Sequence, residues 1–415
     1  MAGTQKLGPQ PSIPIPVRKA QSSQENSASP LPTAQGDYQL PSAGSAMKGY
    51  APLDQAALKL TPRQKAAYDA LSPGEQQSFH SLYCAQGGNA EAQAGLCQIL
   101  ERPPLLKSTD NNGKNLLSVL DGVNGKKGQS SLENAGLSSN QLVASLVKQL
   151  NNPADVYQGD NRTCAVASLQ TYLATSDPAE YCRLATDLWE KGETKFKNGQ
   201  DILLTSPRAG DKRNPLDAML QESWIETAKD FSPTDSESRG EGDGSLLEGM
   251  EALGKALLKY LPVNSVLSFL TGKKEAEINA EGLTSNQIRS LYGSAMSAVP
   301  TVVDVQSNLA KSFNKLTEML DAGHCVTVGL KTASGACHCV NVLGTNNGKV
   351  SFSDPLNGKI KEMPSEKFEK MMAIMVVPEE YAEGYVGKSI VNSIENFAGD
   401  ADEYGGRGGG SGSSR

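Results

Sequence analysis

The order of helix-type and strand-type segments constrains the fold of this chain more than any other feature. Helical patterns come first, whereas residues 324–377 form short runs of alternating apolar and polar side chains. Gly335, Asn346-Asn347-Gly348 and Asn357-Gly358 separate these runs, which is typical of successive antiparallel hairpins. Helices followed by an antiparallel sheet predict an α+β fold.

Several helices are predicted before this sheet. Thr61-Pro62 is a typical N-cap and first-turn pair, and Pro73-Gly74 separates the helix that it begins from the next one. A third helix is expected to end before Pro103. In residues 138–150 apolar side chains recur at spacings of three and four, which predicts an amphipathic helix.

Both ends of the chain have compositions that do not favour folding. The N-terminal segment is rich in Ser, Pro, Gln, Gly and Ala, and the last residues read GGRGGGSGSSR. Such segments bury too little apolar surface to offset the entropy lost on ordering. We also expect a mobile surface loop in the polar insertion around residues 232–244. The predicted division is a disordered segment 1–50, a helical region 51–139, a main domain 140–385, and a terminal helix with a flexible tail 386–415.

Charge and hydropathy disfavour two kinds of partner. The formal net charge is -7, whereas binding to nucleic-acid phosphates needs clustered Lys and Arg. No run of about 18 apolar residues is present, so no transmembrane helix is expected. The N-terminal segment lacks the apolar core of a secretory signal peptide. We therefore expect a soluble protein, either cytoplasmic or secreted without such a signal.

One of the seven cysteines, Cys164, is predicted to open a helix. Asn161 and Thr163 are capping residue types just before it, and apolar side chains recur at helical spacing from Ala165 onward. In the first turn of a helix, free backbone N–H groups and the helix dipole stabilise a thiolate. Cys164 is therefore the candidate nucleophile.

A thiolate nucleophile needs a base. The chain has three histidines, His80, His324 and His338. We choose His338 because it begins a strand pattern whose partner strand ends at Asp354, where a carboxylate would hold the second ring nitrogen. Gln158 lies six residues before Cys164 and would complete an oxyanion hole together with the backbone N–H of Cys164.

The arrangement of these four residues resembles the papain superfamily. Gln158-x5-Cys164 at a helix start, His338-x-Val-x-Val-x-Gly in a strand and Asp354-Pro-x-x-Gly at a strand end are most similar to the double-glycine leader peptidase group. The resemblance covers roughly residues 140–385. It implies a helical half that carries Cys164 and an antiparallel sheet or barrel half that carries His338 and Asp354, with the active site between them.

The same resemblance implies a function. Members of the superfamily cleave peptide or amide bonds through an acyl-thioester, so a protein or peptide substrate is expected and no cofactor. Ala165 follows the nucleophile, where papain has an aromatic residue and leader peptidases usually have glycine. The subfamily and the substrate preference are therefore left open.

Three alternatives stay open beside peptidase activity. Glutamine deamidation or transglutamination uses the same triad and thioester with a different acceptor. A non-catalytic interaction protein would keep the scaffold without a working triad.

A hydrolase with a polar N-terminal segment and no signal peptide also resembles secreted bacterial effectors and toxins that are injected into a target cell. In that case the N-terminal region would contact secretion machinery or a chaperone.

Two further motifs carry weaker signals. Cys337 and Cys339 flank His338, but neighbouring side chains on a strand point to opposite faces and no C-x-x-C pair is present, so we expect no metal site. Residues 382–389 end in Gly-Lys-Ser and resemble a short phosphate-binding loop. We favour a loop and a terminal helix that packs on the main domain.

Overall fold

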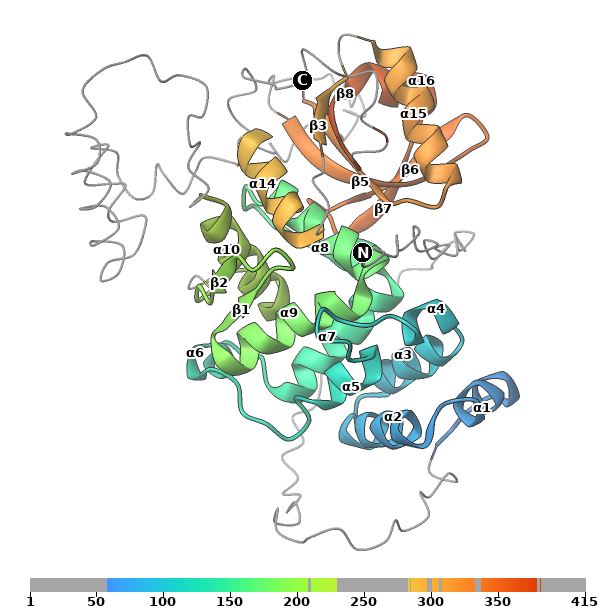
Figure 1. The fold of residues 1–415 in the computed structure, drawn as a ribbon, viewed down its shortest axis with the longest axis vertical. Coiled ribbons are helices and arrows are strands. Elements are labelled where there is room, and N and C mark those ends of the chain that lie inside the picture. Colours follow the sequence, from blue (N-terminus) through green and yellow to red (C-terminus); the bar gives the residue numbers. More distant parts are fainter. Residues whose placement is uncertain are drawn as a thin grey trace, which may run out of the picture.

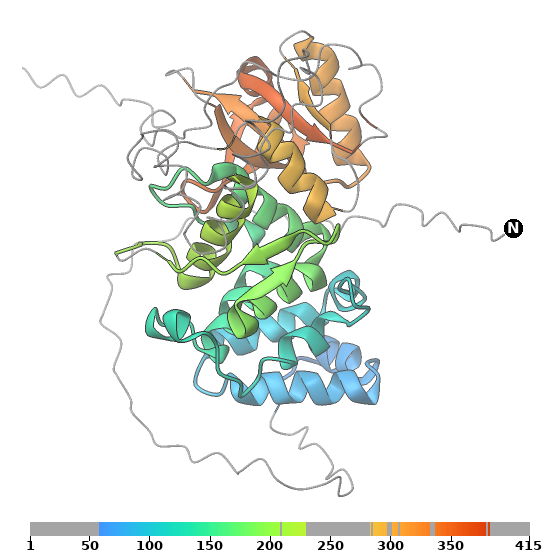
Figure 2. The same cartoon turned by 60° about the vertical axis from the view of Figure 1, so that its left-hand side comes forward.

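The structure is a computed structural model of the chain, and it describes residues 58–207, 210–229, 283, 285–296, 301–305, 308–332, 337–378 and 381. Several expected features lie outside these residues, namely the segments 1–50 and 386–415, the insertion at 232–244, the Gly-Lys-Ser sequence and the Gly335 turn. A sheet with its own helices forms one end of the long axis and the N-terminal helices form the other (Figures 1 and 2). Helices combined with antiparallel sheets confirm the predicted α+β class.

The described residues before Cys164 form helices. They are α1 (Pro62–Asp69), α2 (Pro73–Ala85), α3 (Ala90–Leu100), α4 (Pro103–Leu106), α5 (Leu116–Asp121), α6 (Ser130–Asn134), α7 (Ser139–Asn151) and the 3₁₀ turn η2 (Pro153–Asp155). Thr61, Ser72 and Ser138 begin α1, α2 and α7 with capping boxes, in which cap and third-position residues satisfy each other's backbone N–H groups. The helix starts predicted at Thr61-Pro62 and at Ser138 are therefore confirmed.

The middle of the chain forms a second helical group. It contains α8 (Cys164–Ser176), α9 (Pro178–Lys191), α10 (Pro215–Lys229) and α14 (Ser285–Met296), with a small hairpin of β1 (Glu193–Lys195) and β2 (Asp201–Leu203). In Figure 1, α8 lies between the sheet and the N-terminal helices. Nearly all side chains of α8 are buried, which agrees with this central position.

The C-terminal part is a six-stranded antiparallel sheet. Its strands are β3 (Thr301–Asp304), β4 (Val326–Lys331), β5 (Cys337–Asn346), β6 (Lys349–Asp354), β7 (Lys359–Pro364) and β8 (Met372–Val377), in the spatial order β3-β8-β4-β5-β6-β7. Asn347 and Gly348 both have positive φ, 51° and 72°, which suits the tight turn between β5 and β6. The hairpin predicted at this turn is confirmed.

Helices cover both faces of the sheet. On one face, α15 (Leu309–Asp321) and α16 (Ser365–Met371) pack with Leu316 and Phe368 against Val340 and Phe352. On the other face, Cys339 and Ile374 join an apolar cluster formed with α8 and α14. This second cluster continues into α1–α7, so the N-terminal helices and the helix that begins with Cys164 share one hydrophobic core.

Candidate active site

Cys164 is the first residue of α8. Thr163 is the N-cap, but its hydroxyl donates to Gln221 Oε1 of α10 at 2.8 Å and does not cap the helix. The first backbone N–H groups of α8 therefore have no side-chain cap, and they lie beside the thiol. The prediction that Cys164 opens a helix is confirmed.

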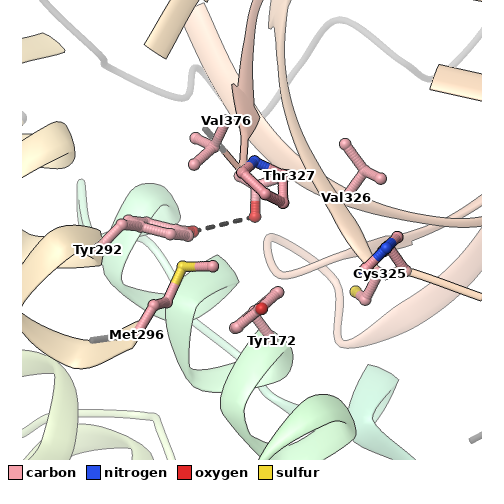
Figure 3. A pocket seen from close by; sticks show the side chains of 9 residues that line it. Tyr172, Tyr292, Met296, Cys325, Val326, Thr327 and Val376 are labelled. Atoms are coloured by element: carbon pink, nitrogen blue, oxygen red, sulfur yellow. Dashed lines mark hydrogen bonds between the residues drawn. The ribbon is translucent and has the colours of Figure 1, made fainter. Parts of the chain in front are cut away.

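Hydrogen bonds from two sides fix α8 against the sheet. Asn341 Nδ2 of β5 donates to the Ser168 carbonyl at 2.7 Å, and Tyr292 Oη of α14 donates to the Ala165 carbonyl at 3.2 Å. The Tyr292 hydroxyl also lies 3.1 Å from Thr327 Oγ1 of β4, the contact drawn as a dashed line in Figure 3. These bonds set the position of the helix start relative to β5.

His338 and Asp354 lie on neighbouring strands of the sheet. His338 Nε2 is 2.8 Å from Asp354 Oδ1, and both side chains are buried, with 1% and 0% of their surface exposed. Asp354 ends β6, so its Oδ1 also accepts the backbone N–H of Leu356 at 3.0 Å in the turn that follows. The structure thus brings together the histidine and the carboxylate that the sequence paired.

Cys164 contacts both His338 and Cys339. The side chains of His338 and Cys339 both lie close enough to Cys164 to shift its pKa. Cys339 is the largest influence and lowers the pKa of Cys164; burial opposes it, and the His338 ring and its charge add to it. The net effect puts the pKa of Cys164 well below its usual value, so the thiolate form is favoured.

The partners of Cys164 have pKa values that suit an ion pair. Burial lowers the pKa of His338, but the hydrogen bonds to Asp354 and Cys164 outweigh burial and raise it to about 9. Burial raises the pKa of Asp354, yet the His338 ring and the Lys361 ammonium bring it to about 2. These directions favour the thiolate of Cys164, the imidazolium of His338 and the carboxylate of Asp354 over their neutral forms.

Gln158 is fully buried in the loop before α8. Its backbone N–H donates to the Pro355 carbonyl at 2.8 Å, which ties this loop to the turn after Asp354. Its side-chain Nε2 donates to the Asn161 carbonyl at 2.8 Å, and no described residue pairs with its Oε1. Gln158 is thus close to the site, with one of its two amide hydrogens already bound.

The other two histidines lie elsewhere. His80 is on α2 beside Cys84, with Nδ1 3.8 Å from the sulfur, and His324 Nε2 is 3.5 Å from the Tyr381 hydroxyl. His324 also lines the small cavity of Figure 3, between the end of α8, α14 and the sheet. The cavity has a volume of about 10 Å³, which is enough for roughly one water molecule.

Sequence reasoning missed two neighbours of the triad. Cys339 has no predicted role beyond flanking His338, although its thiol is the largest influence that lowers the pKa of Cys164. Lys361 of β7 was not considered, although its Nζ lies 2.7 Å from Asp354 Oδ2. The β6–β7 hairpin does contain a signal for Lys361. Lys361 lies opposite Phe352, two residues before Asp354, so its long side chain can reach the carboxylate diagonally.

A buried polar cluster beneath the Cys164 loop was also missed. Asp217 of α10 accepts hydrogen bonds from Gln149 Nε2 at 2.7 Å, Gln170 Nε2 at 2.6 Å and the Tyr157 backbone N–H at 3.1 Å. Burial raises the pKa of Asp217 to about 6, although these donors lower it. Since Tyr157 precedes Gln158, the cluster fixes the loop that leads to Cys164, the candidate nucleophile.

Comparison of the chain with family models, curated proteins and solved structures finds no match. Within the described residues, no group of three or more His, Cys, Asp or Glu side chains is placed to hold a metal ion. The helices in that part of the chain are all too short or too polar to cross a membrane.

Proposed function

We propose that this protein is a cysteine hydrolase with a papain-like arrangement, in which Cys164 is the nucleophile, His338 the general base and acid, and Asp354 the residue that orients His338. The observation that carries the proposal is the position of His338 between two partners. Its Nε2 bonds to Asp354 at 2.8 Å, and we assign the other ring nitrogen, Nδ1, to the Cys164 thiol, which also influences the pKa of the ring. A nucleophile, its base and a carboxylate behind the base are the parts of a catalytic triad.

The proposed reaction is acyl transfer through a thioester. The Cys164 thiolate attacks the carbonyl carbon of a peptide or amide bond, and the carbonyl oxygen becomes an oxyanion. The backbone N–H of Cys164 and the second Nε2 hydrogen of Gln158 are the donors proposed for this oxyanion. His338 gives its proton to the leaving amine, and the C–N bond breaks. Water then loses a proton to His338 and hydrolyses the thioester, which releases the carboxylic acid and restores the thiolate–imidazolium pair.

The burial of the site indicates how the enzyme is controlled. Both Cys164 and His338 have only 1% of their surface exposed. A peptide therefore reaches the sulfur only after the residues that cover it move. We infer a resting state in which the nucleophile is charged but shielded, which limits unspecific reactions with solutes.

The experiment that tests the proposal uses paired substitutions. Cys164→Ala and His338→Ala should each abolish cleavage of a random peptide library, measured by mass spectrometry of the products. Cys84→Ala and His80→Ala are matched controls, because these residues form a second Cys–His contact, on α2, at 3.8 Å. Full cleavage by the Cys164→Ala variant would contradict the proposal.

The same assay separates the alternative reactions. Release of ammonia from glutamine with an intact backbone would identify a deamidase, and amine incorporation would identify a transglutaminase. If the folded wild-type protein shows none of these reactions, a non-catalytic interaction protein is favoured. Delivery as an injected effector, and contact of the N-terminal region with secretion machinery or a chaperone, stay predictions of the sequence.

A further inference from the structure

Asp354 has an unusually complete set of donors for a carboxylate behind a catalytic histidine. Oδ1 receives His338 Nε2 at 2.8 Å and the Leu356 N–H at 3.0 Å. Oδ2 receives Lys361 Nζ at 2.7 Å and Asn357 Nδ2 at 3.4 Å. With no exposed surface and four donors, the carboxylate has almost no freedom to turn.

Lys361 reaches Asp354 from the neighbouring strand. In the β6–β7 hairpin Lys361 pairs with Phe352, two residues before Asp354, so the two charged side chains lie diagonally on one face. The Lys361 side chain keeps 28% of its surface exposed, while the carboxylate is buried. The ammonium thus remains partly hydrated and contacts the anion that the protein has removed from water.

We propose that Lys361 is a positioning residue for the triad: its ammonium holds the Asp354 carboxylate towards His338 Nε2 throughout the catalytic cycle. This inference rests on the proposed function of Cys164 and His338. It assigns to the site a fourth charged residue, contributed by β7.

The physical need for such a cation arises when His338 is neutral. After His338 gives its proton to the leaving amine, Asp354 faces an uncharged ring in a buried place, and burial of an unpaired carboxylate is costly. Without another cation, the carboxylate would take up a proton or turn towards water. Lys361 supplies the missing charge on Oδ2, so Oδ1 keeps its bond to Nε2–H and fixes the ring tautomer.

The same ammonium moderates the basicity of His338. Its positive charge repels the imidazolium through the shared carboxylate, so removal of the charge favours the protonated ring. Other charged groups near Asp354 are Lys359, opposite it on β7 but exposed, and Asp155 on η2, which packs against β6 and β7. Cys164 also interacts with the ring and raises its pKa. Of the two lysines, only Lys361 is hydrogen-bonded to the carboxylate.

The test is a titration of His338 by NMR with isotope-labelled histidine. The chain has only three histidines, so His80→Gln and His324→Gln assign the signals. In Lys361→Met the pKa of His338 should rise by about half a unit, and the share of the Nε2–H tautomer above that pKa should fall. Lys361→Arg should restore both values. Lys359→Met, which removes a charge from the same face of β7, should change neither.

An unchanged pKa and an unchanged tautomer in Lys361→Met would overturn the inference, as would an equal effect of Lys359→Met. Lys361→Gln is the second variant if the methionine variant does not fold. The titration needs no substrate, so its outcome is independent of the peptide assay. Cleavage that depends on His338, combined with an unmoved His338 titration, would reject the role of Lys361 and keep the proposed function.

Discussion

His338 Nε2 and Asp354 Oδ1 lie 2.8 Å apart although sixteen residues separate them in the chain. The turn at Asn347-Gly348 returns the chain as β6, and the pair Asn341–Ser353 fixes the register in which Asp354 passes His338. The contact is buried, so neither partner can exchange the other for water. This bond decides which ring nitrogen is left for Cys164.

The first prediction concerns Asp354→Asn. An amide can neither stabilise the imidazolium nor hold the required tautomer, so the cleavage rate should fall by roughly two to four orders of magnitude. The pKa of His338 should fall from about 9 towards its usual 6.5. Peptide kinetics and histidine NMR measure the two effects. Asp160→Asn is the control, because this acid in the Gln158 loop is 78% exposed. Retention of full activity in Asp354→Asn would show that the carboxylate has no role.

The second prediction concerns Cys339→Ala. Because the Cys339 thiol is the largest influence that lowers the pKa of Cys164, its removal should raise that pKa. The pH dependence of Cys164 alkylation, followed by peptide mapping, measures the change. Cys337→Ala is a matched control on the same strand and equally buried. Equal shifts in the two variants would mean that Cys339 is not the cause.

The third prediction concerns Asp217 and stability in acid. Its pKa is about 6 in the folded protein against a usual 3.8, so the folded state holds a proton that the unfolded chain has released. This group therefore stabilises the fold most below about pH 4, and roughly 3 kcal/mol is lost as the pH rises to about 6. Asp217→Asn should remove this dependence. Urea unfolding at several pH values compares the two proteins, and parallel curves would contradict the assignment.

The fourth prediction concerns stability between about pH 6.5 and pH 8. The raised pKa of His338 gives stability that is lost as the pH rises from its usual 6.5 through about 9. The lowered pKa of Cys164 acts in the opposite direction, because its contribution is gained as the pH rises towards its usual 9.0. In the wild type these two contributions to the free energy of unfolding should oppose each other. In Cys164→Ser only the His338 contribution remains, so this variant should lose stability with rising pH. Identical slopes in urea unfolding would count against a thiolate–imidazolium pair.

The sequence predicted the part of the site that local rules determine. Capping residue types indicated that Cys164 opens a helix, and hairpin turns fixed the spacing of His338 and Asp354. Cys339 could not be assigned in the same way, because its role depends on where the start of α8 meets β5. That position is set by tertiary hydrogen bonds such as Asn341 to Ser168. No local pattern predicts such a bond.

Other features depend on contacts between distant elements. Asp217 collects donors from α7, from α8 and from the loop before Gln158, and each of these polar residues alone is typical of a surface helix. The predicted division at residue 139 follows the extent of the family resemblance, and the apolar cluster runs from α1–α7 into α8. Burial of this kind depends on which helices meet, and periodicity gives only the face of each helix.

The measurement that tests the central proposal most directly is the thiolate content of the protein as a function of pH. The ultraviolet absorbance of the wild type minus that of Cys164→Ala reports this thiol even while it is buried. A thiolate should be present well below the pH at which an ordinary cysteine ionises, and it should require His338. A Cys164 thiol that ionises only at its usual value of 9.0, or ionises in the same way in His338→Ala, would contradict the thiolate–imidazolium pair.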